Sequence, residues 1–202
     1  MPSIIQASSG SALNHVRGLM RSFVVWHREN HREDLALIDR YFDEDEFERE
    51  LAELPGPYAP PPAPARAPLQ WIAVDGFARP LGAYEAEAEP LPEPAGGCLL
   101  IAYSAGMPAG CVALRNLGEG VCEMKRMFVP MTFRGLGVGR ALADRVMAEG
   151  RRLGYRRMRL DTSRRQHEAI SLYEKSGFTR IAPYYELTED LRSWLVFYER
   201  RL

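Results

Sequence analysis

Three glycines at alternate positions, in the segment R-G-L-G-V-G-R at 134–140, constrain the fold of this chain more than any other feature. Glycine adopts left-handed dihedral angles without steric cost and lets other groups approach the backbone closely, so the segment predicts a tight turn. The residues before it form an apolar, strand-like run, and those after it have helical periodicity. We therefore expect a turn that joins a strand to a helix.

The sequence pattern changes at this turn. Upstream, three apolar runs joined by short turns predict an antiparallel meander, with strands at 98–103, 109–114 and 121–129. Downstream, helices alternate with strands; the helices are expected at 137–153 and 166–176, and the strands at 157–161, 178–181 and 193–200. This order predicts an α/β (α+β) fold with a mixed, mostly antiparallel central sheet flanked by helices.

The N-terminal part adds three elements to this prediction. An edge strand is expected at 3–7, and a helix that reaches about residue 30 has Ser11 as its expected N-cap. A second, acidic helix is expected at 43–54, where Pro55 ends it.

Proline is concentrated in one part of the chain. Eleven of the fifteen prolines lie between Pro55 and Pro94, and such a run favours extended geometry over helix or central strand. We expect a single domain over 1–202, with 55–97 as a Pro-rich insertion or lid within it. Inside this segment, 69–77 is expected to form a short strand or a packed flap.

Composition excludes several classes of protein. The 26 basic and 27 acidic residues leave a net charge of −1, unlike a protein that coats nucleic acid. No apolar stretch approaches the roughly 18–20 residues of a membrane span, and the first residues lack the pattern of a signal peptide. Three cysteines without a C-x-x-C motif suit a reducing compartment. We expect a cytoplasmic monomer or homodimer without nucleic-acid or membrane partners.

Charge is nevertheless unevenly distributed. Ten acidic residues lie between Glu33 and Glu53, whereas nine arginines lie between Arg140 and Arg165. This asymmetry indicates either two solvated helix faces of opposite sign or a role in attracting ligands.

The glycine turn suits an anion, because free N–H groups and the helix dipole favour negative charge at a helix N-terminus. Its spacing matches neither the Walker pattern nor G-x-G-x-x-G, since the third glycine position of the latter holds Arg140. Taken alone, the turn is also compatible with a tight connection that binds nothing.

Two motifs in order give a resemblance to a known family. R-x-x-G-x-G (Arg134, Gly137, Gly139) resembles the acetyl-CoA motif of the GNAT superfamily of N-acetyltransferases. The segment E-A-I-S-L-Y-E-K-S-G-F at 168–178 resembles the helix and strand that follow in that family, and R-L-G-Y-R-R-M-R-L-D-T lies between them. The resemblance is strong over 110–185, weaker over the first two helices and absent over 62–97.

The resemblance implies a GNAT-like fold that takes acetyl-CoA as cosubstrate and holds no metal. In the family, backbone N–H groups of the glycine turn hold the pyrophosphate, and the end of the preceding strand pairs with the pantetheine arm. An N–H near Phe128 would then stabilise the oxyanion. The residues carried over are Met127, Phe128, Val129, Arg134, Gly135, Leu136, Gly137, Val138, Gly139 and Arg140.

The resemblance also implies a catalytic pair. Glu123 lies 11 residues before Arg134, where some members carry a glutamate base. Lys125 lies on the same strand face two residues later, and pairing with it would make Glu123 a weaker base. A cross-strand ion pair is the alternative role of Glu123. Tyr173 matches the tyrosine that protonates the departing thiolate in many members; a packed aromatic is its alternative. Gln166 stands where many members have asparagine.

The acceptor is expected to be a small cationic amine, because the first two helices border the acceptor site in the family and are acidic here. Two alternatives remain at this stage: a non-catalytic acyl-CoA-binding regulatory module, and a protein N-terminal or lysine acetyltransferase. Trp71, Trp194, Tyr184 and Tyr185 are candidates for shaping the pocket. His27 and His31, spaced i,i+4, are expected to lie on a solvated helix face, and the cysteines to be inert buried thiols.

Overall fold

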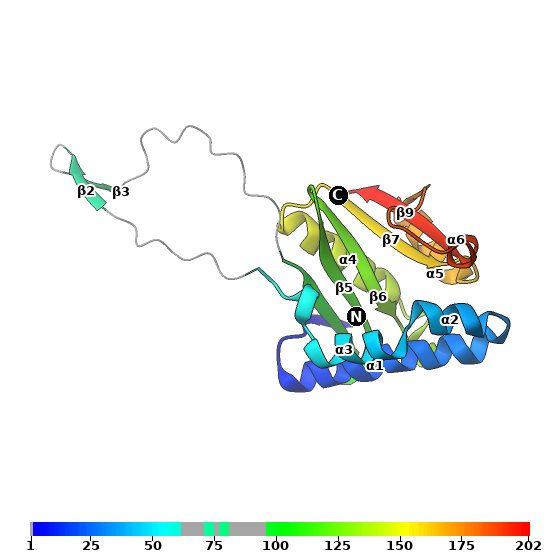
Figure 1. Ribbon diagram of the computed structural model, residues 1–202. Helices are drawn as coiled ribbons and strands as arrows, with labels where there is room; N and C mark the ends of the chain where they lie inside the picture. The colour runs from blue at the N-terminus through cyan, green and yellow to red at the C-terminus, as the bar shows by residue number, and fades with distance from the viewer. Residues whose placement is uncertain (1, 62–70, 75–76, 81–95) are drawn as a thin grey trace.

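The computed structural model describes residues 2–61, 71–74, 77–80 and 96–202 (Figure 1). Seven strands form one sheet in the order β1-β4-β5-β6-β7-β9-β8, and β6 and β7 are its parallel pair. The predicted mixed, mostly antiparallel sheet is therefore confirmed. Its strands are β1 (Ser3–Gln6), β4 (Cys98–Ser104), β5 (Met107–Gly118), β6 (Val121–Phe128), β7 (Arg157–Ser163), β8 (Thr179–Ile181) and β9 (Leu195–Arg201).

Helices cover both faces of this sheet (Figure 1). They are α1 (Gly10–Asn30), α2 (Leu35–Tyr41), α3 (Glu44–Glu53), α4 (Val138–Arg152), α5 (His167–Lys175) and α6 (Glu189–Trp194). Short 3-10 turns lie at Arg32–Asp34, Gly56–Tyr58 and Met131–Phe133. Strands β2 (Trp71–Val74) and β3 (Phe77–Pro80) pair with each other as a separate two-stranded sheet.

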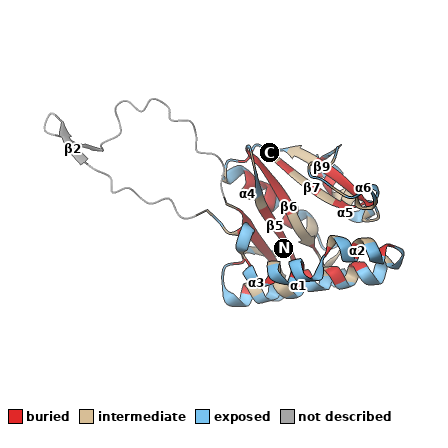
Figure 2. Ribbon diagram, viewed as in Figure 1, coloured by how far each residue is buried: buried red, intermediate tan, exposed pale blue. Residues whose placement is uncertain are grey.

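Two hydrophobic cores form because successive side chains of a strand point to opposite faces. Leu99 and Ile101 of β4 pack in one core with α1, α2 and α3, whereas Leu100 packs in the other with α4 and α5. The side chains of Leu99, Leu100 and Ile101 are all buried, and Figure 2 shows buried residues along the central strands. Full burial of such a side chain stabilises the fold by about 1.5–3 kcal/mol.

The parallel strands β6 and β7 pair over a short stretch and then separate. Their register joins Val121 to Arg157, Cys122 to Met158 and Glu123 to Arg159. Figure 1 shows the two strands diverging from there toward α1 and α5. Residues of both strands, among them Lys125 of β6 and Asp161 of β7, line a small cavity at this point.

A bulge in β6 lies beside this divergence. Cys111 is opposite Phe128 and Ala113 is opposite Lys125, so two residues of β6 face one residue of β5. Arg126 takes up the extra length with a φ of 55°, in the left-handed region. A bulge changes the direction in which the neighbouring side chains point, and bulges are common next to active sites.

Several predicted element bounds need correction. Helix α1 is capped by Ser9, whose hydroxyl accepts from the Ala12 N–H at 3.3 Å, rather than by Ser11. The strand expected at 193–200 starts at Leu195, because the two preceding residues end α6. Helix α2 was not predicted. Most of the segment predicted as an insertion or lid, 55–97, lies outside the described residues.

Within the described ranges, no helix combines the length and the apolar character needed to cross a membrane.

Candidate active site

A groove of about 870 Å³ runs between the end of β6, the glycine turn and helices α1 and α5. Of the residues predicted to bind acetyl-CoA, eight line it: Met127, Phe128, Val129, Arg134, Gly135, Gly137, Gly139 and Arg140. The other two belong to the same turn but do not line the groove, since Leu136 points to solvent (62% exposed) and Val138 is buried.

The glycine turn has the backbone geometry that its sequence predicts. Gly135 and Gly137 have φ values of 75° and 78°, and Gly137 caps the N-terminus of α4. A Cβ atom added at either position would meet nothing within 4 Å, so the space beside the turn is open to a ligand. The first N–H groups of α4 lack partners within the helix, which makes this end suitable for phosphate.

Arg134 holds the turn in place. Its Nε donates to the Val129 carbonyl oxygen at 3.1 Å, and its Nη1 contacts Glu168 Oε2 at 3.0 Å. The guanidinium also lies 4.3 Å from the centre of the Trp26 ring. These contacts tie the turn to β6, α5 and α1 at once, so part of the positive charge expected for a phosphate is already engaged in the fold.

A narrow passage of about 40 Å³ continues from this groove between the diverging strands. The groove and the passage share Phe23, Met127, Gln166 and Tyr173 as lining residues. Tyr173 is buried, and its burial together with the negative charge of Asp161 raises the pKa of its hydroxyl. The hydroxyl therefore keeps its proton at physiological pH.

Gln166 and His27 meet at the wall of the passage. Gln166 Nε2 lies 2.5 Å from His27 Nε2, and burial lowers the pKa of His27 to about 4. His27 is thus a neutral side chain in the protein interior, and the expectation that it lies on a solvated helix face is wrong.

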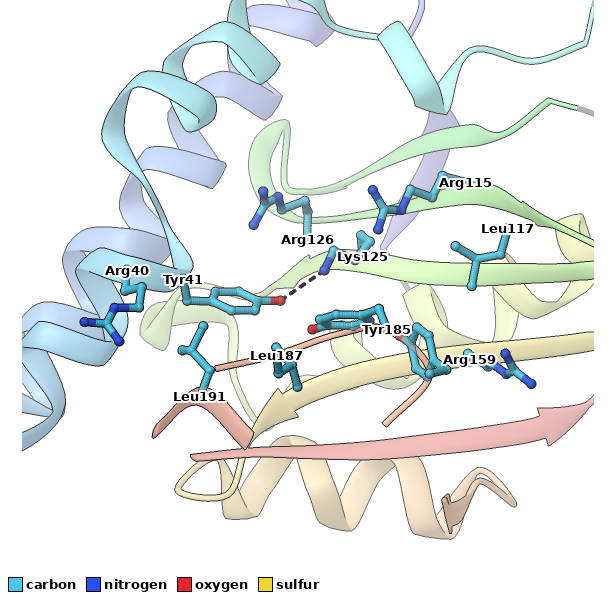
Figure 3. Close-up of a pocket in the computed structure, with 11 residues that line it drawn as sticks. Arg40, Tyr41, Arg115, Leu117, Lys125, Arg126, Arg159, Tyr185, Leu187 and Leu191 are labelled. Carbon is cyan, nitrogen blue, oxygen red and sulfur yellow. Dashed lines mark hydrogen bonds between the residues drawn. The ribbon is translucent and has the colours of Figure 1, made fainter. Parts of the chain in front are cut away.

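A second cavity, of about 390 Å³, lies on the other side of the passage and shares Tyr41, Lys125 and Arg126 with it. Its walls come from β5, β6, β7, α2, α6 and the loop before α6 (Figure 3). The lining residues are Arg40, Tyr41, Arg115, Leu117, Lys125, Arg126, Arg159, Tyr184, Tyr185, Leu187 and Leu191. We call this space the acceptor cavity.

Glu123, the predicted base, is completely buried beside the acceptor cavity. Its Oε2 accepts from Arg115 Nε at 2.5 Å, and its Oε1 accepts from the Tyr184 hydroxyl at 2.6 Å. Arg115 of β5 lies directly opposite Glu123 of β6, so the cross-strand ion pair expected as the alternative role of Glu123 is present. Lys125, on the same strand as Glu123, has its Nζ 3.8 Å from Oε1. Tyr184 lines the acceptor cavity, and Glu123 lies behind it.

Asp161 forms a second buried carboxylate site that was not predicted. Its Oδ2 accepts from the Tyr41 hydroxyl at 2.5 Å, and its Oδ1 accepts from Lys125 Nζ at 3.1 Å. Burial acts against the charged form of Asp161, but Lys125 and the Tyr41 hydroxyl outweigh it and lower the pKa. The sequence could have pointed to Asp161 through the alternation in β7. That alternation places Asp161 on the same face of the strand as Arg159, and Met158 and Leu160 on the other face.

The lining of the acceptor cavity is not the acidic surface on which the expectation of a cationic acceptor rested. Three acidic residues of α2 and α3 form ion pairs with arginines: Asp39 with Arg28, Glu48 with Arg21, and Glu50 with Arg126. What lines the cavity instead is a set of five basic side chains. The expectation rested on acidic character along the chain, which does not say which side chains face the site.

The remaining candidates have structural places. Trp194 donates from Nε1 to Asp34 Oδ2 at 2.9 Å inside the core, whereas Tyr184 and Tyr185 line the acceptor cavity. The side chain of Trp71 lies outside the described part of the structure. Cys98, Cys111 and Cys122 are buried and unpaired, as expected, and burial raises the pKa of each thiol to about 12. Among the described residues, no cluster of His, Cys, Asp and Glu suits a metal ion.

Comparison with known proteins identifies the family. The sequence model of the Acetyltransferase (GNAT) family matches residues 61–178, more than half of the chain. The chain belongs to the GNAT acetyltransferase family. An uncharacterised N-acetyltransferase of Schizosaccharomyces pombe is 39% identical over 94 residues, which cover 46% of this chain and 58% of that protein.

Two further GNAT comparisons agree with the fold. IAA acetyltransferase of Azospirillum brasilense is 40% identical over 86 residues, covering 42% of this chain and 56% of its own. The chain thus spans little more than half the length of these curated relatives. The PaiA N-acetyltransferase of Thermoplasma acidophilum, solved in complex with coenzyme A, matches over 100% of this chain and 99% of its own, with a TM-score of 0.62 and 12% identity. This last likeness shows the shared fold.

Proposed function

We propose that this protein transfers the acetyl group of acetyl-CoA to the primary amine of a small molecule by direct attack of the amine on the thioester. The observation that carries the proposal is that the groove, the passage and the acceptor cavity adjoin one another, since Tyr173 lines the first two and Lys125 lines the last two. The cosubstrate and the acceptor would thus reach one point from opposite sides.

The groove suits acetyl-CoA in size and chemistry. Its volume of about 870 Å³ is within the range of small-molecule sites. The open space beside Gly135 and Gly137 at the N-terminus of α4 fits a pyrophosphate, with backbone N–H groups from Gly135 to Arg140 as donors. The Thermoplasma protein of the same fold was solved with coenzyme A, which supports this assignment.

The end of β6 supports the placement of the thioester. Met127, Phe128 and Val129 line the groove where β6 has separated from β7. Backbone N–H groups at this point are suited to pair with a pantetheine arm and, near Phe128, to stabilise the oxyanion of the tetrahedral intermediate.

Tyr173 acts as the general acid in this proposal. It lines both the groove and the passage, and its raised pKa keeps the hydroxyl protonated, so a proton is available beside the sulfur when negative charge develops on the departing thiolate.

Glu123 acts as the general base through Tyr184. An ammonium cannot attack the thioester, so it must first give up a proton. In the proposed relay the amine proton passes to the Tyr184 oxygen while the hydroxyl proton of Tyr184 passes to Glu123 Oε1, 2.6 Å away. The neutral amine then attacks, Tyr173 gives its proton to the departing thiolate, and the second amine proton passes to the Tyr173 oxygen. The first proton leaves Glu123 for solvent by the reverse path after the product departs.

Calorimetric titration with acetyl-CoA, coenzyme A and dephospho-CoA, followed by a thiol-release assay with a panel of primary amines, tests the proposal. We expect micromolar binding, weaker without the 3′-phosphate, and release of one thiol for each acetylated amine. No binding to folded protein would overturn the proposal. Binding without thiol release for any small amine would favour a non-catalytic module, and release with peptides alone would favour a protein acetyltransferase.

A further inference from the structure

The acceptor cavity is lined by basic side chains from four separate elements. Arg115 comes from β5, Lys125 and Arg126 from β6, Arg159 from β7, and Arg40 from α2 (Figure 3). The other lining residues are three tyrosines and three leucines. Within the described ranges, no carboxylate belongs to the lining, so the groups that face the cavity are N–H donors, phenols and apolar surface.

Each of the five cations pairs with a carboxylate that does not line the cavity. Glu50 and Asp190, the partners of Arg126 and Arg40, are 16% and 40% exposed. Glu123 and Asp161, which pair with Arg115 and Lys125, have side chains with no exposed surface. Glu199 pairs with Arg159 at 2.8 Å and is 21% exposed. A molecule inside the cavity therefore meets the cations first, and the carboxylates act mainly by fixing the directions of those cations.

The arginines are oriented so that they retain donors for a ligand. Arg115 and Arg159 contact their carboxylates through Nε. A guanidinium carries four further N–H donors on its two Nη atoms, in a planar fork that matches a carboxylate or a phosphate. The side chains of Arg115 and Arg159 are 38% and 26% exposed, so they are reachable from the cavity.

An ammonium group alone is a poor match for this cavity. It can only donate hydrogen bonds, and it would meet the positive charge of several lining side chains. An anionic group matches it well, because each lining cation offers charge-assisted hydrogen bonds. Resting on the proposed function, we infer that the acceptor is an anionic amine: a small molecule that carries a carboxylate or phosphate, held by Arg115 and Arg159, besides the amine that is acetylated.

The shape of the site supports a two-point arrangement. The cavity opens to the passage at Tyr41, Lys125 and Arg126, while Arg115 and Arg159 line the cavity without lining the passage. An anion bound at these two arginines leaves an amine, two or three bonds away, free to point toward the passage and Tyr173. The anionic group thus positions the amine for attack on the thioester.

Pairs of amines that differ in one charged group test the inference. β-Alanine is compared with propylamine, phosphoethanolamine with ethanolamine, and putrescine serves as the cationic amine, all by thiol release from acetyl-CoA. We expect the anionic member of a pair to have at least a 10-fold higher kcat/KM, and its KM to rise with added salt. β-Alanine and phosphoethanolamine distinguish a carboxylate from a phosphate ligand. Equal or better rates with propylamine, ethanolamine or putrescine would overturn the inference while leaving acetyl transfer intact.

Two neighbouring arginines provide a matched pair of variants. Arg159 and Arg157 both contact Glu199 Oε2, at 2.8 Å and 3.8 Å, but Arg159 lines the acceptor cavity and Arg157 does not. Arg159→Gln is expected to raise the KM for the preferred anionic amine about 10-fold with little change in kcat, and to leave the KM for propylamine unchanged. Arg157→Gln is expected to leave all of these constants unchanged. Equal effects of the two variants would contradict the inference.

A binding measurement separates this inference from the proposed function. Glutarate, which has carboxylates but no amine, is titrated into protein saturated with coenzyme A. Glutarate binding that Arg159→Gln weakens supports an anion site even if no amine releases thiol, in which case the proposed acetyl transfer fails alone. If glutarate did not bind but uncharged amines were acetylated, the anion site would be refuted and the proposed acetyl transfer would stand.

Discussion

The Tyr184 hydroxyl donates a 2.6 Å hydrogen bond to Glu123 Oε1, and it is Tyr184 that lines the acceptor cavity. The carboxylate is completely buried, so in the proposed mechanism a proton from the acceptor reaches it through the phenol. Burial and the nearby negative charges of Asp161 and Glu123 raise the pKa of Tyr184, so this phenol does not ionise at neutral pH. It passes a proton on rather than storing a negative charge.

This relay predicts that Glu123 and Tyr184 act as a unit. Glu123→Gln and Tyr184→Phe should each lower kcat by about 100-fold, and the double variant should be no slower than the worse single variant. Steady-state kinetics of the three variants, with circular dichroism to verify folding, tests this expectation. Multiplicative losses, or full activity of Glu123→Gln, would remove Glu123 from the proton path.

Tyr173→Phe should lower kcat by about 100-fold without weakening acetyl-CoA binding, because the phenol is needed when the thiolate departs. Tyr198→Phe is the matched control, since Tyr198 is buried in the same core and donates to Glu174 at 3.1 Å, away from the cavities. Rates with acetyl-CoA and calorimetric Kd values for coenzyme A separate the two effects. A Tyr173→Phe enzyme as fast as Tyr198→Phe would show that no acid is required at this position.

Gly137→Ala should weaken coenzyme A binding about 10-fold and lower stability by about 1–2 kcal/mol, because alanine is strained at a φ of 78°. Gly118→Ala provides the control for strain. Gly118, the last residue of β5 before the turn to β6, has a φ of 84°, and a Cβ there also meets nothing within 4 Å. The phosphate site would be supported if both variants lowered Tm by a similar amount but only Gly137→Ala raised the Kd for coenzyme A. Equal Kd values would contradict it.

Asp161→Asn should cost about 3–5 kcal/mol of stability at pH 7, because it leaves the buried Lys125 without its main partner. The pKa of Asp161 is lowered in the folded protein, so its contribution is present above the ordinary carboxyl pKa of about 3.9 and is lost as pH falls through the folded value. Urea unfolding from pH 7 to 3 should show the wild type and the variant converging at the acid end.

The surface pair Arg28–Asp39 is the control for this measurement. Both side chains are about half exposed, so Asp39→Asn should cost less than about 1 kcal/mol at any pH. If Asp161→Asn lowered the free energy of unfolding by as little as Asp39→Asn, the buried Asp161–Lys125 pair would contribute nothing to the stability of the fold.

The three cysteines should take no part in the reaction. Each is buried with a thiol pKa of about 12, so little thiolate exists at neutral pH. Native protein should react slowly with a thiol reagent, and Cys122→Ala should retain kcat within about 3-fold of wild type. An acetylated cysteine found by mass spectrometry during turnover would contradict direct attack.

The sequence by itself determined the order of the elements, the glycine turn and the family. These are properties of short segments: the dihedral angles of Gly135 and Gly137, the alternation of β4, and the helical spacing of α4 are each set by neighbouring residues. Glu123 and Tyr173 could be named because they lie at characteristic distances from those motifs.

The tertiary structure decided the surroundings of these residues. The charge of the acceptor cavity depends on Arg40, Arg115 and Arg159, which come together from α2, β5 and β7. It depends equally on where the carboxylates lie, since Glu50 and Glu123 face their arginines from behind rather than the cavity. Acidic composition near the N-terminus therefore predicted the wrong sign of charge, because an electrostatic site is made by contacts distant in sequence.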